Sequence, residues 1–202
     1  MDIKKLSNKY KEEVIDLRRN FHMHPEPSRE EFNTSKKIKQ ELDKLNIPYT
    51  SVAETGIVAT IQGTKEGKTI ALRADIDALS VTEENELDYK SKNEGLMHAC
   101  GHDCHISMLL GAAKVLTEVK DKLKGTVKLF FQPAEEIAFG AQAMIDDGVL
   151  EGVDGVFAIH VWSDIEQGKV SIEQGPRMAS ADIFTIKVTG QGGHGSAPHQ
   201  GI

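Results

Sequence analysis

Eight consecutive residues, from His98 to His105, hold three imidazoles, two thiols and one carboxylate. Thiolates and neutral imidazoles are the usual protein ligands of zinc and of its neighbours in the first transition row. Cys100 and His102 can reach one metal ion only if the backbone turns between them, and Gly101 permits such a turn. Apolar residues at helical spacing follow this His/Cys cluster, so we expect it at the start of a buried helix.

A structural zinc knuckle, or a few core histidines, is the alternative interpretation of the His/Cys cluster. A structural zinc site usually closes its coordination shell with paired cysteine knuckles. The sequence contains only two cysteines, Cys100 and Cys104. The pattern therefore favours a catalytic metal site, in which one coordination position stays open for water.

Two acidic pairs follow apolar runs that have the composition of β-strands. Asp75 and Asp77 end one such run, and alternation places their carboxylates on the same side of an extended chain. Glu135 and Glu136 follow another run. Aspartates are also common in turns at strand ends, and adjacent surface glutamates are commonplace. In a catalytic metal site, however, one glutamate can bind the metal while its neighbour takes a proton from water.

Further histidines lie outside the cluster. His160 belongs to the apolar run 155–162, which we expect to form a strand. A lone strand histidine is more often a core residue, but the other candidate donors favour a ligand role here. His22 and His24 stand at the end of an apolar helical stripe and are interpreted as surface or capping residues.

Helices and strands alternate along most of the chain, a pattern typical of an α/β sheet covered by helices on both faces. Helices are expected before Pro25, from a capping-box pattern at 28–31, and after the His/Cys cluster. In open α/β sheets, ligands bind at the carboxyl ends of strands. We therefore expect both acidic pairs, the His/Cys cluster and His160 to meet at one edge. The expected strands span 56–61, 69–74, 126–131, 155–162, 169–173 and 182–188.

The 202 residues suffice for one good-sized domain or slightly more. The formal net charge of −7 argues against nucleic acid as a partner. No apolar run is long enough to cross a bilayer, and the charged N-terminus has no apolar signal region behind it. Two cysteines among histidines fit a reducing compartment, so we expect a cytoplasmic protein without a membrane partner.

Five motifs together resemble the M20 metallopeptidase/amidohydrolase family, and within it the N-acyl-amino-acid amidohydrolases. That branch includes hippurate hydrolases, auxin-conjugate hydrolases and N-acetyldiaminopimelate deacetylases. The motifs occur in the family's order and span nearly the whole chain. They are LRADIDAL at 72–79, MHACGHDCH at 97–105, FQPAEE at 131–136, IHVW at 159–162 and GGHGSAPH at 192–199.

The resemblance implies a site with two divalent metal ions, for which zinc, manganese, cobalt and nickel are candidates. Glu135 matches the family's general base. The family's ligand positions are matched by Cys100, His102, Glu136 and His160.

The resemblance also implies supporting roles. Asp77 matches an aspartate that other branches hold behind a metal-bound histidine. His194 matches a histidine of a smaller domain that steadies the tetrahedral intermediate, often across a dimer. Asp103 and His105 are interpreted as residues that support the ligands, and Cys104 is not taken as a ligand.

The fold implied by the resemblance is a zinc-peptidase-like mixed sheet with helices on both faces, followed by the beginning of a smaller α+β dimerisation or lid domain. We expect the catalytic domain at 1–180 and the smaller domain at 181–202. Family chains are roughly twice as long, and their last metal ligand is a histidine near the C-terminus. Residues 137–140 also differ from the run of glycines found in many members.

The implied activity is metal-dependent hydrolysis of an N-acyl amino acid or small peptide to a carboxylic acid and a free amino acid. A homodimer formed through the smaller domain is expected. The alternative is a truncated, non-catalytic metal-binding or assembly module. The acyl group, the amino acid and the native metal stay open.

Overall fold

The structure is a computed structural model that describes residues 2–176, 178–180 and 182–201. The chain divides into two compact units, Met1–Trp162 and Ser163–Ile202. The expected domain boundary falls beside residue 181, which lies outside the described residues. The limits 1–180 and 181–202 therefore stay a prediction.

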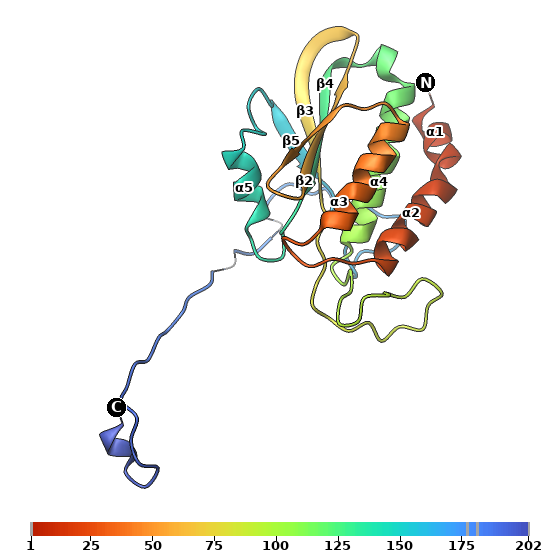
Figure 1. The fold of residues 1–202 in the computed structure, drawn as a ribbon. Coiled ribbons are helices and arrows are strands. Elements are labelled where there is room, and N and C mark those ends of the chain that lie inside the picture. Colours follow the sequence, from red (N-terminus) through yellow and green to blue (C-terminus); the bar gives the residue numbers. More distant parts are fainter. Residues whose placement is uncertain (1, 177, 181, 202) are drawn as a thin grey trace. The chain divides into compact units, whose positions relative to one another are not determined.

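The first unit is a five-stranded sheet with helices on both faces, as predicted from the sequence (Figure 1). No helix in the described part of the chain is both long and apolar enough to span a membrane. The elements are α1 (Ile3–Lys9), α2 (Lys11–Met23), α3 (Phe32–Lys44), β1 (Tyr49–Val52), β2 (Gly56–Gln62), β3 (Lys65–Asp75), α4 (His102–Glu118), η1 (Lys120–Lys122), β4 (Lys124–Gln132), α5 (Gly140–Asp146) and β5 (Gly155–Ala158).

The strands lie in the order β1-β2-β4-β3-β5. β3 is parallel to both of its neighbours, β4 and β5, whereas β2 is antiparallel to β1 and β4. The carboxyl ends of β3, β4 and β5 therefore meet at one edge of the sheet. This arrangement confirms the prediction that the segments following these strands converge.

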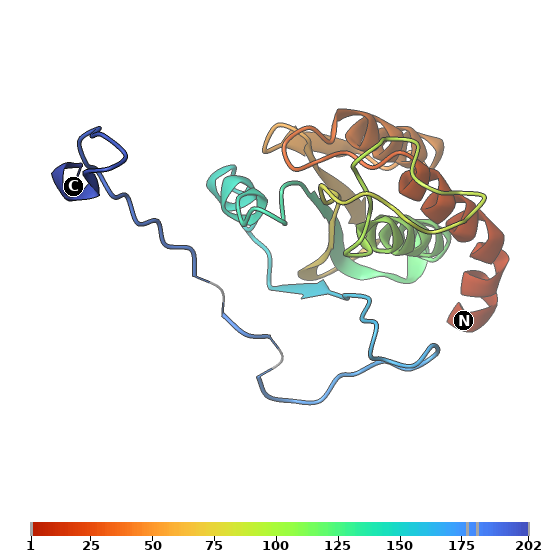
Figure 2. The same ribbon diagram turned by 90° about the horizontal axis from the view of Figure 1, so that it is seen from below.

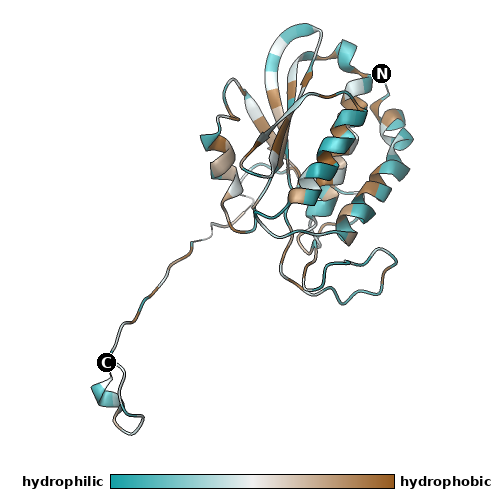
Figure 3. Cartoon of the chain, viewed as in Figure 1, coloured by the Kyte–Doolittle hydropathy of each residue, from teal (hydrophilic) through white to brown (hydrophobic). Residues whose placement is uncertain are grey.

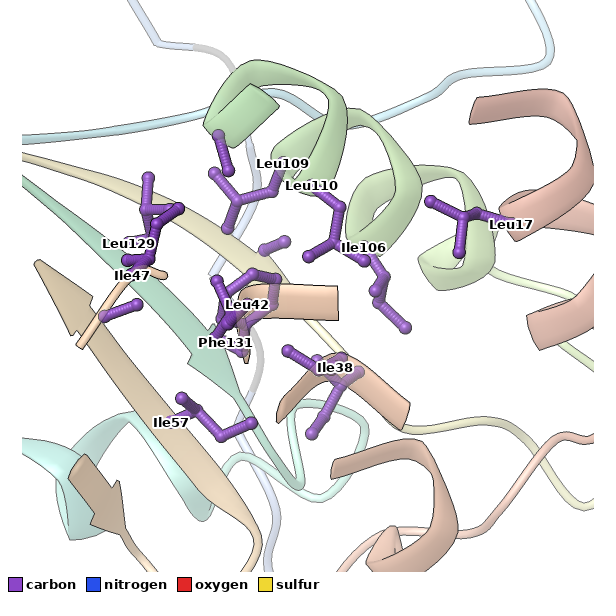
Figure 4. Close-up of a cluster of buried hydrophobic side chains, with 14 of the residues drawn as sticks. Leu17, Ile38, Leu42, Ile47, Ile57, Ile106, Leu109, Leu110, Leu129 and Phe131 are labelled. Carbon is purple, nitrogen blue, oxygen red and sulfur yellow. The ribbon is translucent and has the colours of Figure 1, made fainter. Parts of the chain in front are cut away.

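The two faces of the sheet pack against different helices (Figures 1 and 2). One face carries Ile57 and Phe131, which pack with α2, α3 and α4 in the main core (Figure 4). The opposite face carries Val58 and Phe130, which pack with Met144 of α5. Strand alternation separates the two sets, and Figure 3 shows apolar stretches on the strands beside alternating polar and apolar turns on α1 and α2.

The start of α3 differs from the prediction. The helix begins at Phe32, just after the capping-box pattern at 28–31 instead of within it. The carboxylate of Glu26 caps the first turn, since it accepts hydrogen bonds from the backbone N–H groups of Asn33 at 3.1 Å and Thr34 at 2.7 Å. The pattern was misleading because its two side chains bind groups elsewhere in the fold.

Between β3 and α4 the chain makes a long excursion. Leu79 and Met97 close it, because each donates its backbone N–H to the carbonyl of the other, at 3.1 and 3.0 Å. The two ends of the excursion are therefore held together, and it ends immediately before the His/Cys cluster.

The second unit contains one short 3₁₀ helix, η2 (Pro198–Gln200), and no strand among its described residues. The strands expected at 169–173 and 182–188 are therefore wrong for this structure. A strand is stable only when a neighbour pairs with its backbone groups, and alternation of residue types does not supply that neighbour.

Candidate metal centre

The His/Cys cluster forms a tight turn at the start of α4. Gly101 precedes the helix with φ of +84°, a conformation that favours glycine. A Cβ atom at this position would also lie 2.3 Å from Cγ2 of Val161. Both conditions require glycine, and the resulting turn places Cys100 and His102 around one point.

His102 is fully buried and presents one ring nitrogen to a group of carboxylates. Its Nδ1 lies 2.9 Å from the carbonyl oxygen of Asp77. A carbonyl only accepts, so Nδ1 carries a proton, and in the neutral ring Nε2 keeps a lone pair. Nε2 has no hydrogen-bond partner in the described part of the chain. It lies 3.6 Å from Asp75 Oδ2, 3.7 Å from Glu136 Oε1 and 3.8 Å from Glu135 Oε2.

Glu135 and Glu136 follow a turn at the end of β4 that has a left-handed residue, Ala134, at φ of +49°. Buried Glu31 holds this turn, because its carboxylate accepts hydrogen bonds from the Ala134 N–H at 2.8 Å and from the Thr55 hydroxyl at 2.6 Å. Glu31 was predicted as half of a capping box. It instead positions the segment that carries the acidic pair.

Asp77 connects several parts of the site. Its Oδ2 accepts hydrogen bonds from the Ser28 hydroxyl at 2.7 Å and from the backbone N–H of Glu136 at 3.0 Å. Its other oxygen lies 3.3 Å from Nδ1 of His102. The fully buried Asp77 carboxylate thus orients a histidine and a glutamate at once.

His160 lies just beyond β5, which ends at Ala158, so the prediction that it sits inside a strand is wrong. Its Nδ1 donates to the carbonyl of Val161 at 2.5 Å. Its Nε2 lies 3.5 Å from Sγ of Cys100. A sulfur and an imidazole nitrogen at this separation are placed as two ligands of one tetrahedral ion would be.

Acidic groups lie close together in the site, and burial and the nearby charges raise the pKa of two of them. Burial, followed by the nearby Glu136 carboxylate, raises the pKa of the Cys100 thiol to about 12. Burial, together with Glu135 and Asp77, also raises the pKa of Glu136. Oε1 of Glu136 has no hydrogen-bond partner in the described residues. A divalent cation would reverse both pKa shifts and satisfy this oxygen and Nε2 of His102.

The structure therefore fits a metal centre on its own geometry. Three groups of donors share His102, and within each group the ligand atoms lie within 4.8 Å of one another. The combination of sulfur, nitrogen and carboxylate oxygen suits zinc and other first-row metals. The groups are Cys100 with His102 and His160, His102 with Glu135 and Glu136, and His102 with Asp75 and His105.

Of the histidines interpreted as surface or capping residues, His22 is buried. It donates to Asp103 at 2.8 Å and to Glu83 at 3.1 Å, and the first of these bonds contributes most to raising its pKa. Arg18 lies 2.9 Å from the same Asp103 carboxylate. No local pattern could reveal this network, because its partners come from distant segments. His24 is exposed, as predicted.

His194 lies in the second unit, on the loop that precedes η2. Its side chain is exposed, and its Nδ1 lies 2.8 Å from the hydroxyl of Ser196. Its expected catalytic role stays a prediction.

Comparison with known proteins gives a consistent result. The family model for peptidase family M20/M25/M40 matches residues 71–198. Thermostable carboxypeptidase 1 of Saccharolobus solfataricus is 48% identical over 99% of this chain and 53% of its own length. The N-acyl-L-amino acid amidohydrolase of Geobacillus stearothermophilus is 43% identical over 100% of this chain and 55% of its own length.

Among solved structures, the YXEP protein of Bacillus subtilis, described as a dinuclear metal binding peptidase from the M20 family, superposes with a TM-score of 0.79. It is 42% identical, and the match covers 86% of this chain and 48% of that one. The chain spans about half the length of the relatives it matches. Its matched residues, its fold and its identity to these proteins show that the chain belongs to peptidase family M20/M25/M40.

Proposed function

We propose that this chain carries the metal-binding, amide-hydrolysing part of an enzyme that cleaves N-acyl amino acids or small peptides. The products are a carboxylic acid and a free amino acid. One observation carries the proposal: Nε2 of buried His102 faces three carboxylates without a hydrogen-bond partner among the described residues. The amidohydrolase name of the Geobacillus relative supports the acylated substrate.

Cys100, His102, Glu136 and His160 would hold two divalent ions, with zinc, manganese, cobalt and nickel as candidates. Such ions, when bound, supply Lewis-acid polarisation of the amide carbonyl and lower the pKa of water. The carboxylate of Glu136 is well placed as a ligand because its side chain is only 17% exposed and one oxygen has no partner among the described residues.

Glu135 has the properties of the proton carrier. Its side chain is 39% exposed, so its carboxylate reaches solvent while Oε2 stays 3.8 Å from His102 Nε2. It takes a proton from the attacking water and gives it to the amide nitrogen as the C–N bond breaks, so that the amine leaves neutral. Asp77 holds His102 in the tautomer that exposes Nε2, and we assign His194 to the steadying of the tetrahedral intermediate.

We also propose an oligomeric state, a cellular location and a class of partner. We infer a homodimer formed through the smaller domain, from the resemblance to the family. A cytoplasmic location is supported by the two cysteines, both free thiols in the structure. The net charge of −7 supports a small-molecule substrate over nucleic acid.

The test is metal analysis of the purified full-length protein, combined with hydrolysis assays on N-acetyl and N-benzoyl amino acids. We expect about two metal ions per chain and release of free amino acid. A peptide with a free N-terminus provides the comparison that separates deacylase from peptidase activity. Metal binding without hydrolysis of any of these substrates would favour the alternative, a non-catalytic metal-binding module. The name of the Geobacillus relative does not favour that alternative.

A further inference from the structure

His105 joins β3 to the segment that carries His160. Its imidazole is buried, and its Nδ1 forms a hydrogen bond with Oδ1 of Asp75 at the end of β3. The second oxygen of Asp75 accepts from Nη1 of Arg73 at 2.8 Å. Because a carboxylate held by a guanidinium acts as the acceptor, Nδ1 of His105 is the donor.

The other ring nitrogen of His105 accepts a hydrogen bond. The backbone N–H of Val161 donates to Nε2 at 3.0 Å. This bond requires a lone pair on Nε2, which agrees with a proton on Nδ1. Both nitrogens are therefore occupied by protein groups. His105 is for this reason a poor metal ligand, although it lies close to Asp75 and His102.

The contact with Val161 matters because the segment beyond β5 has left the sheet. The strand ends at Ala158, and the pairing of β3 with β5 ends with Arg73 and Ala158. Val161 is then fixed by its N–H bond to His105, and its side chain lies close against Gly101. Two residues, Ile159 and His160, lie between the end of the strand and this anchor.

The rings of His105 and His160 are also in contact. Their centroids are 4.5 Å apart and their planes form an angle of 70°. An edge-to-face contact of this kind restricts the rotation of the more exposed ring. With its ring confined in this way, His160 directs Nε2 toward Sγ of Cys100, 3.5 Å away.

We propose that His105 is a positioning residue that fixes His160 opposite Cys100 by accepting the Val161 N–H. It acts through His160 and does not itself bind the metal. The consequence for metal affinity rests on the proposed function, whereas the anchoring of Val161 can be measured without metal.

Two substitutions separate the two hydrogen bonds of His105. The carbonyl of glutamine can occupy the place of Nε2, so His105→Gln keeps the acceptor for Val161. The amide of asparagine can occupy the place of Nδ1, so His105→Asn keeps the donor to Asp75 and loses the acceptor. Both variants remove the imidazole, which makes them a matched pair.

The first readout is hydrogen exchange of the Val161 amide in metal-free protein. We expect exchange in His105→Asn to be faster by roughly tenfold, the effect of losing one hydrogen bond, and exchange in His105→Gln to resemble wild type. Equal exchange in all three proteins would overturn the proposal. If His105→Asn does not fold, rapid exchange in a folded His105→Gln would do the same.

The second readout is cobalt titration, followed by the absorption band between thiolate and cobalt that reports ligation by Cys100. We expect the cobalt affinity of His105→Asn to fall about 10–100-fold, as for other groups that orient ligands, with His105→Gln much closer to wild type. Equal loss in both variants would show that the bond to the Val161 N–H is not what positions His160, and would overturn the proposal. Absence of the band in wild type would count against the proposed function alone, because the exchange readout needs no metal.

Discussion

The buried carboxylate of Glu31 accepts a 2.8 Å hydrogen bond from the backbone N–H of Ala134, the residue before the acidic pair Glu135–Glu136. Ala134 has a left-handed backbone, which is unfavourable for a residue with a side chain. A fully buried charge that accepts bonds from the backbone and from Thr55 thus maintains a strained turn at the metal centre.

Replacing Glu31 with glutamine should lower the free energy of unfolding by about 1–3 kcal/mol. The –NH2 group of glutamine would take the place of one carboxylate oxygen, so the donor that bonds to this oxygen would lose its acceptor. Urea unfolding measures the loss. The exposed neighbour Glu30 is the control, and Glu30→Gln should change stability by less than about 0.5 kcal/mol. Equal effects of the two substitutions would contradict this role of Glu31.

Substitutions at two left-handed glycines should have different costs. Gly95 and Gly101 have φ of +76° and +84°, but only Gly101 has an atom close to the place of a Cβ. Gly95→Ala should therefore cost about 1–2 kcal/mol, and Gly101→Ala about 1–3 kcal/mol more because of the clash with Val161. Thermal unfolding of both variants gives the comparison, and a similar loss in each would show that the clash is relieved elsewhere.

The two cysteines should differ in metal binding. Cys100 lies opposite His160, whereas the pKa of the Cys104 thiol is raised by burial and by Asp103, away from the donor groups. Cys100→Ala should strip metal from the folded protein, and Cys104→Ala should leave the metal content unchanged. Elemental analysis of the purified variants measures this directly. Unchanged stoichiometry in Cys100→Ala would exclude it as a ligand.

The adjacent glutamates should have separable effects. In the full-length protein, Glu135→Gln should keep the metal content and lose about two to four orders of magnitude in kcat, the range for removal of a general base. Glu136→Gln should instead weaken metal binding. Metal titration and steady-state kinetics on one N-acyl amino acid separate the two. Normal metal affinity in both variants would remove Glu136 from the ligand set.

The His22 network predicts a pH-dependent contribution to stability. The hydrogen bonds to Asp103 and Glu83 raise the pKa of His22 against the opposing effects of burial and Arg18. A raised pKa means that this stabilisation is complete below the unfolded value of about 6.5 and is lost as pH rises through the folded value.

The destabilisation caused by His22→Gln should accordingly be larger at mildly acidic than at alkaline pH. Chemical unfolding of wild type and variant across this range is the measurement. His24→Gln, at an exposed histidine two residues away, is the control and should show little pH dependence. A destabilisation that grows with pH would mean that His22 is neutral in the folded protein.

The central strands are predictable because each is an apolar run bounded by glycine or charged residues. The runs 56–61, 69–74 and 126–131 lie within β2, β3 and β4. Parallel strands end at one edge, so the meeting of their following segments was also predictable. The geometry of those segments was not, because it depends on side chains such as Glu31 and His105 that bind backbone groups about 55 to 100 residues away.

His160 illustrates the limit of periodicity. The run 155–162 is apolar enough for a strand, but β5 ends at Ala158 and Val161 donates its N–H to a side chain. His22 illustrates a second limit, since its burial depends on Asp103, 81 residues further along the chain. Local sequence reports which residues favour a strand or a helix, and not which distant group completes their hydrogen bonds.

The closed excursion between Leu79 and Met97 makes the segment immediately before the His/Cys cluster adjustable in length. Within it, Glu83 accepts the backbone N–H of Ser91 at 2.7 Å, so the exposed tip at 84–88 starts and ends at a fixed place. The entropy of closing such a loop grows slowly, by about 0.6 kcal/mol for each doubling of its length. Insertions at this tip could therefore vary without displacing the turn at Gly101, which leaves a part of the surface free to diverge between otherwise similar enzymes.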